Sequence, residues 1–381
     1  MDGLFYPDRS PSTGAKLIRH IYRPIRVRHI ADETFEIFNT TGFTPGERYA
    51  LLFCWNDGTR TMLRPKAAPL SSIRVRLHTG TATAEGRILT VYVTDTQTGN
   101  TVSTEQLVLE EPTLPTPKAT GKPVGLCFPN GQFCLELPDG HKLIASDPFT
   151  ILWRAATDND RDPMSRDSMR HWYGMKETVQ NIRTLNNRIE VRTVLTGLEG
   201  QFELTDIYEG IADGILVTSR LHCLRDSGTI PRFGKAFRLN RRFDEVCYRG
   251  RTGESYCDMK EQFPISTVSC KVADMTEPNI RPQESGNRCD CSWASVSDGA
   301  VSVRFEAVDR PFELGIKPYS DKALLRMRHR EDEIRTGTYV TIQAFQQGIG
   351  TGSCGPRTAP EFSYPVTEDY LLRFLIRVEK I

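Results

Sequence analysis

The sequence has no marked excess of one charge and no long run of apolar residues. Its 49 lysines and arginines balance 48 aspartates and glutamates, which leaves a formal net charge of +1. Such a chain lacks the positive field that draws proteins to nucleic acid or to an anionic membrane, so we expect neither partner. It offers no run of ~18 apolar residues to span a bilayer. The first residues reach Pro7, Asp8 and Arg9 before any apolar run, which argues against a secretory signal there.

The ten cysteines lie far apart, and no Cys-x-x-Cys pair occurs among them. Its absence argues against a zinc knuckle or a redox pair and favours reduced thiols in strands. In "GLCFPNGQFC" a two-residue Asn-Gly turn would place Cys127 opposite Cys134, and the sequence leaves open whether the two are bonded. Cys289 and Cys291 have no second pair of ligands, so we interpret them as packed side chains.

Apolar and polar residues alternate along most of the chain, and each alternating segment ends in a cluster of turn residues. The clearest segments are residues 48–58, 71–80, 87–100, 188–197 and 214–223. A period of two predicts half-buried strands, and hence an all-β chain. Helical signals are limited to two short segments, residues 165–175 and 320–329, the second with Ser320 as N-cap.

A proline-rich segment divides the chain. Residues 110–123, "EEPTLPTPKATGKP", hold four prolines without apolar periodicity, which is typical of a stiff linker. We expect an immunoglobulin-like β-sandwich over residues 18–111, because about seven short strands fit that length. After a linker at residues 112–123, residues 124–381 are too long for one simple sandwich and predict a large antiparallel β super-sandwich.

Three aspartates at alternate positions, Asp158, Asp160 and Asp162, stand out in "WRAATDNDRD". The spacing begins like an EF-hand calcium loop, but position six is Pro instead of Gly and position twelve is Met instead of Glu. A catalytic carboxylate pair would need a facing partner across the bond that is cleaved. We therefore expect a loop whose Asp and Asn side chains bond nearby backbone amides, with Arg154 paired to one of the acids.

Several ordered motifs resemble the C-terminal region of glycoside hydrolase family 2 β-galactosidases. They are "LWRAATDNDRD" (152–162), "IPRFGKAF" (230–237), "RGRTGESYCD" (249–258), "IRPQESGNRCDCSW" (280–293) and "QGIGTGSCGP" (347–356), all similar to that family's small chain. In front of them, "KLIRHIYRPIRV" and "FEIFNTTGFT" resemble the preceding immunoglobulin-like domain, and residues 1–17 resemble the end of the catalytic barrel. The resemblance implies a galactose-mutarotase-like super-sandwich for residues 124–381.

The resemblance also implies that the catalytic glutamates lie on a (β/α)8 barrel, which needs roughly 250 residues of alternating strand and helix. No such segment is present, so we expect a non-catalytic portion of a retaining β-galactosidase that packs on the barrel and shapes its pocket. Candidates for the pocket rim or for carbohydrate contact are Asp158, Asn159, Glu254, Ser353 and Cys354. Motif positions expected to be structural are Trp153, Arg154, Asp160, Pro231, Arg232, Tyr256, Asp258, Pro282, Gln283, Glu284, Gly348 and Gly350.

Two motifs depart from the family pattern. Cys354 stands where the best-known members place a tryptophan, and a cysteine offers no broad apolar face for a pyranose ring. The family's Trp-Tyr-Gly-Arg-Gly-Pro run reads Cys247 to Thr252, which removes the aromatic residue and the Gly-Pro turn. In the Gly-x-Gly-x-Gly run from Gly348 no helical pattern follows to form a phosphate cradle, so a turn or rim loop is favoured.

By the resemblance, the partners are the catalytic barrel domains of the same enzyme, a β-galactoside substrate and further copies in a homo-oligomer. No cofactor is expected in this chain, while magnesium and sodium belong to the barrel region. One alternative is a free-standing carbohydrate-binding or structural module. Another is a mutarotase-like enzyme, although His171, His222 and His329 lie in no motif for that chemistry. The sequence leaves a cytoplasmic or periplasmic location open.

Overall fold

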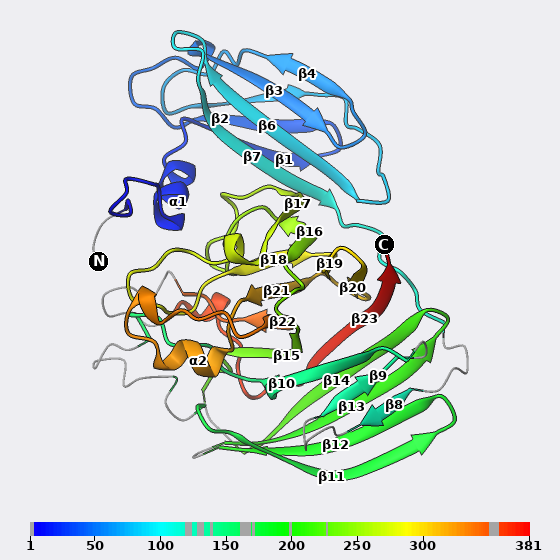
Figure 1. Cartoon of the computed structure of the whole chain (residues 1–381). Coiled ribbons are helices and arrows are strands. Elements are labelled where there is room, and N and C mark those ends of the chain that lie inside the picture. The colour runs from blue at the N-terminus through cyan, green and yellow to red at the C-terminus, as the bar shows by residue number, and fades with distance from the viewer. Residues whose placement is uncertain are drawn as a thin grey trace. The chain divides into compact units, whose positions relative to one another are not determined.

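The computed structural model describes residues 4–118, 124–127, 133–137, 140–160, 169, 172–197, 200–225, 228–349 and 358–381 (Figure 1). Two compact units divide the chain. The first comprises Met1–Thr113 with Glu261–Ile265, and the second comprises Leu114–Lys260 with Ser266–Ile381. Within the described residues, no helix is both long enough and apolar enough to cross a membrane.

In the described part of the first unit, seven strands form two antiparallel sheets, ordered β1-β2-β5 and β4-β3-β6-β7. The strands are β1 (Ile25–Ala31), β2 (Thr34–Asn39), β3 (Tyr49–Trp55), β4 (Arg60–Leu63), β5 (Ser72–Arg76), β6 (Arg87–Asp95) and β7 (Thr101–Glu110). Alternate residues of β3, from Tyr49 to Trp55, are buried and meet apolar residues of the other sheet in one core. The two-sheet sandwich predicted from the alternation is confirmed.

A helix that the sequence analysis did not predict precedes this sandwich. Helix α1 spans Thr13–Ile21, and the Ser12 hydroxyl caps it by accepting a hydrogen bond from the Ala15 amide. The prediction of only two short helical segments was therefore wrong. The sequence does contain signals for helix α1, because an N-capping serine precedes apolar residues at helical spacing.

The described residues of the second unit form two larger antiparallel sheets. The seven-stranded sheet has the order β18-β21-β22-β15-β10-β9-β8, and the nine-stranded sheet has the order β11-β12-β13-β14-β23-β20-β19-β16-β17. The seven-stranded sheet comprises β8 (Gly125–Cys127), β9 (Cys134–Glu136), β10 (Lys142–Ile151), β15 (Arg232–Leu239), β18 (Asn287–Cys291), β21 (Phe312–Lys317) and β22 (Thr338–Gln346). The nine-stranded sheet comprises β11 (Lys176–Leu185), β12 (Arg188–Thr196), β13 (Gln201–Ile211), β14 (Gly214–Arg225), β16 (Glu245–Arg251), β17 (Ile265–Lys271), β19 (Trp293–Ser297), β20 (Val301–Ala307) and β23 (Tyr370–Lys380).

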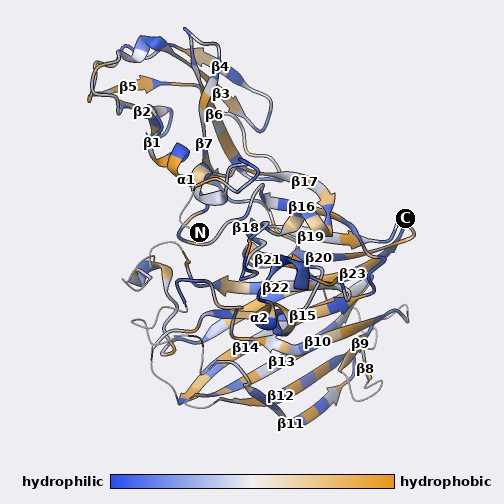
Figure 2. Ribbon diagram, turned by 60° about the vertical axis from the view of Figure 1, so that its left-hand side comes forward, coloured by the Kyte–Doolittle hydropathy of each residue, from blue (hydrophilic) through white to orange (hydrophobic). Residues whose placement is uncertain are grey.

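One apolar core lies between these two sheets, and it follows from the alternation of the strands. Along β12, Ile189, Val191 and Leu195 are buried while their neighbours are not, and blue and orange residues alternate along β12 and β13 in Figure 2. The chain is thus all-β, with a sandwich followed by a larger antiparallel super-sandwich, as the sequence predicts.

A buried ion pair also joins the two sheets inside the core. The Nζ of Lys235 on β15 lies 2.6 Å from Oδ2 of Asp206 on β13, and both side chains are almost fully buried. The Thr150 hydroxyl and the Ser219 hydroxyl hydrogen-bond the lysine and the aspartate, respectively. Both charges are therefore satisfied without water, which is the condition for burying an ion pair at tolerable cost.

Two local predictions are confirmed in this unit. Helix α2 spans Asp321–Arg326, and the Ser320 hydroxyl caps it by accepting from the Ala323 amide. Cys127 lies directly opposite Cys134 in the pairing of β8 with β9, and both thiols are free. The Asn-Gly turn between them lies outside the described residues. So does most of the other predicted helical segment, of which residues 172–174 form a turn.

Candidate functional site

The candidate site is the face of the seven-stranded sheet that points away from the core. On β21, Phe312, Leu314 and Ile316 belong to the core, so Glu313 and Lys317 point to the opposite face. The same alternation on β15 and β22 places further polar side chains there. We call this set the polar face; it comprises Arg232, Glu313, Lys317, Thr341 and Gln343, all of which are buried.

The loop 153–160, which holds the first motif, begins in the core and ends at the polar face. Trp153 is 4% exposed and packs edge-on against Tyr173. Arg154 points the other way and is 1% exposed. Its Nη2 lies 3.0 Å from Oδ1 of Asp160, and its Nε lies 3.2 Å from Oδ2 of the same carboxylate. The predicted pairing of Arg154 with one of the acids is confirmed.

Asp160 also accepts hydrogen bonds from the amide and the hydroxyl of Thr157, both at 3.0 Å. Burial alone would raise its pKa, but the Arg154 guanidinium and the Thr157 donors outweigh burial and lower the pKa below the usual value. Asp160 is therefore an ionised structural anchor, and the predicted bonding of an aspartate to a nearby backbone amide is confirmed.

The same loop is joined to residues 347–349, at the start of the glycine-rich motif. Arg154 donates to the carbonyl oxygens of Gln347 and Gly348, the latter at 3.3 Å. Asn159 donates from Nδ2 to the carbonyl oxygen of Ile349 at 2.9 Å. Two motifs separated by nearly two hundred residues in the sequence are thus bonded to each other.

Asp158 is the exposed member of the loop. Its backbone amide donates to Oε1 of Gln283 at 2.8 Å, and its carboxylate lies 3.8 Å from Nη1 of Arg281. A third motif, residues 280–293, is thereby attached to the first. The exposed carboxylate of Asp158 can reach a partner or a ligand from this position.

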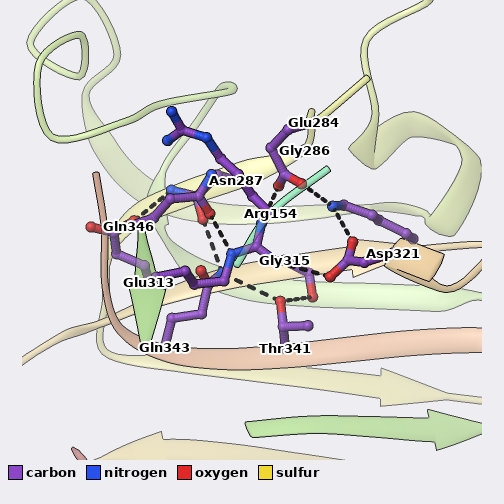
Figure 3. Close-up of polar contacts among 12 residues, drawn as sticks. Arg154, Glu284, Gly286, Asn287, Glu313, Gly315, Asp321, Thr341, Gln343 and Gln346 are labelled. Atoms are coloured by element: carbon purple, nitrogen blue, oxygen red, sulfur yellow. Dashed lines mark hydrogen bonds and ion pairs between the residues drawn. The ribbon is translucent and has the colours of Figure 1, made fainter. Parts of the chain in front are cut away.

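A cluster of four buried charges lies where β15, β21 and helix α2 meet (Figure 3). Arg232 contacts Glu284 at 2.5 Å and Asp321 at 2.9 Å, and Lys317 contacts the same two carboxylates at 2.8 Å each. Two cations balance two anions, and the two cations lower the pKa of Asp321 despite its burial. This charge cluster holds Glu284 of the motif 280–293 on the polar face.

Glu254 lies beside this cluster and is 7% exposed. It accepts from the Tyr256 hydroxyl and from the Gly286 amide, both at 3.0 Å. Burial, followed by repulsion from Glu277, raises the pKa of Glu254 from 4.5 to about 7. Near neutral pH this carboxyl is therefore partly protonated.

Glu313 is a second buried carboxyl on the polar face (Figure 3). Its Oε2 accepts from Nδ2 of Asn287 at 2.6 Å, and Asn287 accepts in turn from Nε2 of Gln343 at 3.1 Å. Burial raises the pKa of Glu313 to about 7, against the opposing effect of the Asn287 hydrogen bond. Glu313 on the polar face and Glu254 in the motif 249–258 are thus two buried carboxyls that change charge near neutral pH.

The remaining motif residues pack around these groups. A methyl group on Gly348 would lie 2.5 Å from Cγ of Asp258, so only glycine fits at position 348 while Asp258 keeps this place. Pro231 accepts a hydrogen bond from the Gln347 amide, and Pro282 is buried. Asp162, Gly350, Ser353 and Cys354 lie outside the described residues.

Sequence reasoning missed Glu313, Lys317, Asp321 and Gln343. Glu313 and Lys317 alternate with apolar residues on β21, a pattern that usually indicates a solvated face of a sheet. That face is instead covered by loops from distant parts of the chain. One of these residues had a signal in the sequence. Asp321 directly follows Ser320, which was predicted to cap the helix that lies next to this sheet.

The site is built mainly to hold its own side chains. Nearly every charged group on the polar face is bonded to another residue of the chain, and Asp158 and Asn159 lie at the margin of this network. Among the described residues, no group of three or more His, Cys, Asp or Glu side chains is placed to hold a metal ion.

Comparisons with known proteins agree with the motifs. A family model described as "Beta galactosidase small chain" matches residues 129–376. The β-galactosidase of Staphylococcus xylosus is 25% identical over 415 residues, which cover 93% of this chain and 40% of that protein. The β-galactosidase of Actinobacillus pleuropneumoniae is 23% identical over 436 residues, which cover 100% of this chain and 41% of that protein. The chain therefore spans about two fifths of these relatives.

Solved structures with a related arrangement include a galactose mutarotase-like protein from Lactobacillus casei. It is 8% identical with a TM-score of 0.37, and the match covers 67% of this chain and 100% of that one. An alpha-mannosidase from Enterococcus faecalis is 10% identical with a TM-score of 0.35 over 94% of this chain and 42% of that one.

Proposed function

Because the chain belongs to the β-galactosidase small-chain family, we propose that it is the C-terminal portion of a β-galactosidase that hydrolyses terminal β-D-galactosides. In this proposal the chain does not carry the catalytic carboxylates. It packs on a (β/α)8 barrel and forms one wall of the barrel's pocket, with Asp158 and Asn159 nearest to the sugar.

The observation that carries this proposal is the convergence of the motifs on one face. Segments of all five motifs are joined at the polar face or its covering loops by the Arg154 bonds, the Gln283 bond, the bond from Gly286 to Glu254 and the charge cluster. A buried network of this kind costs free energy to assemble, and it holds its covering loops in one fixed geometry. A fixed outer surface is what a wall of another domain's pocket requires.

The buried carboxyls are poor candidates for catalysis within this chain. Retaining hydrolysis needs two carboxyl groups about 5 Å apart on either side of the bond that is cleaved. Glu254 and Glu313 are both buried and bonded to neighbouring side chains or amides, so neither offers a free face to a substrate.

The experiment is complementation with a barrel-containing fragment, assayed by hydrolysis of a nitrophenyl β-D-galactoside. We expect no turnover by this chain alone, and turnover when the two are combined. Turnover by the purified chain alone would refute the non-catalytic role. Binding of lactose by the chain alone, with no association with the fragment, would favour the alternative of a free-standing carbohydrate-binding module.

A variant of the combined enzyme tests the position of Asp158. Since its carboxylate is exposed, Asp158→Ala should raise KM several-fold while leaving the unfolding midpoint unchanged. Asp213→Ala removes another exposed aspartate, one that pairs with Arg377, and serves as the matched control. An unchanged KM in Asp158→Ala would remove this residue from the proposed pocket wall.

A further inference from the structure

Strand β11 is an open edge of the nine-stranded sheet. It pairs with β12 alone among the described strands and stands at the end of the strand order. Nine of its ten residues are exposed, and the tenth is half-buried. One row of its backbone N–H and C=O groups therefore faces away from the sheet, which is an arrangement that pairs readily with another strand.

The exposed side chains of this edge include apolar ones. Val179 is 51% exposed, Ile182 is 44% exposed, and Leu185 is 58% exposed. Val179 lies opposite Thr193 of β12, and Ile182 lies opposite Val191. Those two β12 residues are buried, so Val179 and Ile182 lie on the core-facing side of the sheet. At β11, however, the core no longer covers this side, and both side chains are exposed.

A break in the pairing of β11 with β12 sets which of its residues share a face. The register shifts between Val179 and Asn181, so Gln180 is an extra residue. As a result, Glu177, Val179, Ile182 and Thr184 lie on the core-facing side. This arrangement is nearly symmetric about the point between Gln180 and Asn181.

We propose that β11 pairs antiparallel with β11 of a second copy of this chain, about a two-fold axis between Gln180 and Asn181. In this register Val179 lies opposite Ile182 of the second copy, and Ile182 lies opposite its Val179. An isologous contact requires such a self-complementary strand, in which each contact occurs twice.

The other cross-strand pairs in this register are also compatible. Glu177 lies opposite Thr184, and Lys176 lies opposite Leu185, so no like charges face each other directly. Both pairs join residues on the same side of the sheet, and the extra residue Gln180 of each strand lies next to the axis, opposite Asn181 of the other copy. The two nine-stranded sheets then become one continuous sheet. This proposal does not depend on the proposed function.

Sedimentation velocity over a range of concentrations tests the proposal. We expect the unsubstituted chain to form a two-copy species, and Ile182→Lys to raise its dissociation constant at least about tenfold, because the lost apolar pair occurs twice. Ile334→Lys is the matched control, since Ile334 is 69% exposed and lies elsewhere in the same unit. A one-copy mass at all concentrations overturns the proposal, as does an Ile182→Lys chain that associates like the control.

Cysteine cross-linking tests the register. When Val179→Cys chains are mixed with Ile182→Cys chains and oxidised, we expect a disulfide-linked pair of chains. Either variant alone should not cross-link through the new cysteine, because identical positions would lie about 10 Å apart, too far for a disulfide. The unsubstituted chain measures any background from the native thiols. No cross-link in the mixture, or equal cross-linking in each variant alone, overturns the proposed register.

Discussion

The buried carboxyl of Glu254 makes a prediction about stability and pH. Its pKa in the folded chain is about 7, against 4.5 for an ordinary glutamate, because burial and Glu277 disfavour the charged form. The folded state therefore holds this proton to a higher pH than the unfolded state does. The resulting stability is fully present below pH 4.5 and is lost as the pH rises through about 7.

The size of the effect follows from the two pKa values. At about 1.4 kcal/mol per unit of pKa, the difference between 4.5 and about 7 corresponds to roughly 3 kcal/mol lost between low pH and pH 8. Glu254→Gln replaces the carboxyl by a neutral group of the same shape, whose amide can donate to the Tyr256 hydroxyl. This variant should be more stable than the unsubstituted chain at pH 8 and of similar stability at pH 5.

The assay is urea unfolding at pH 5 and at pH 8, followed by tryptophan fluorescence. The matched control is Glu331→Gln, which changes an exposed glutamate of the same unit and should leave the pH dependence unaltered. If Glu254→Gln and the unsubstituted chain lose the same free energy of unfolding between the two pH values, the carboxyl does not titrate near neutrality. That result would refute the reasoning from burial.

Two further predictions concern packing in the second unit. Lys235→Met should cost about 3–5 kcal/mol of unfolding free energy, because it leaves Asp206 buried without its cation. Adding Asp206→Leu should recover much of that loss. Chemical denaturation measures both variants, and equal losses in the single and double variants would contradict the pairing. Gly348→Ala should destabilise the chain by about 1–3 kcal/mol, because its methyl group would meet Asp258 at 2.5 Å, while Gly42→Ala, where nothing lies within 4 Å, should not be destabilised by any clash.

Much of the fold follows from the period of the sequence. Alternation along segments such as residues 188–197 predicts half-buried strands, and the length of the second part predicts two large sheets. The Ser320 cap predicts the start of α2, and the spacing of Cys127 and Cys134 predicts their pairing. Helix α1 was missed because its apolar residues were attributed to the first sandwich, although Ser12 and the helical spacing were present in the sequence.

The candidate site was predicted only where the motifs are contiguous. Arg154 and the acid that it pairs with, Asp160, are only six positions apart in one loop, so local chemistry decides the pairing. The burial of Glu313 and Lys317 could not be predicted from the local sequence. It depends on loops from elsewhere in the chain that cover a face otherwise exposed to solvent. Sequence period shows which residues share a face, and tertiary contacts alone decide which faces stay dry.

The bonds from Arg154 to Gln347 and Gly348 end on carbonyl oxygens of the main chain. Every amino acid supplies that oxygen, so the tie does not depend on the side chains of Gln347 and Gly348. Substitutions of Gln347 can accumulate over evolution without releasing the loop, whereas Gly348 is also limited by its contact with Asp258, and any replacement of Arg154 breaks both bonds. Relatives that share these bonds are therefore expected to vary at the position of Gln347 and to keep the arginine.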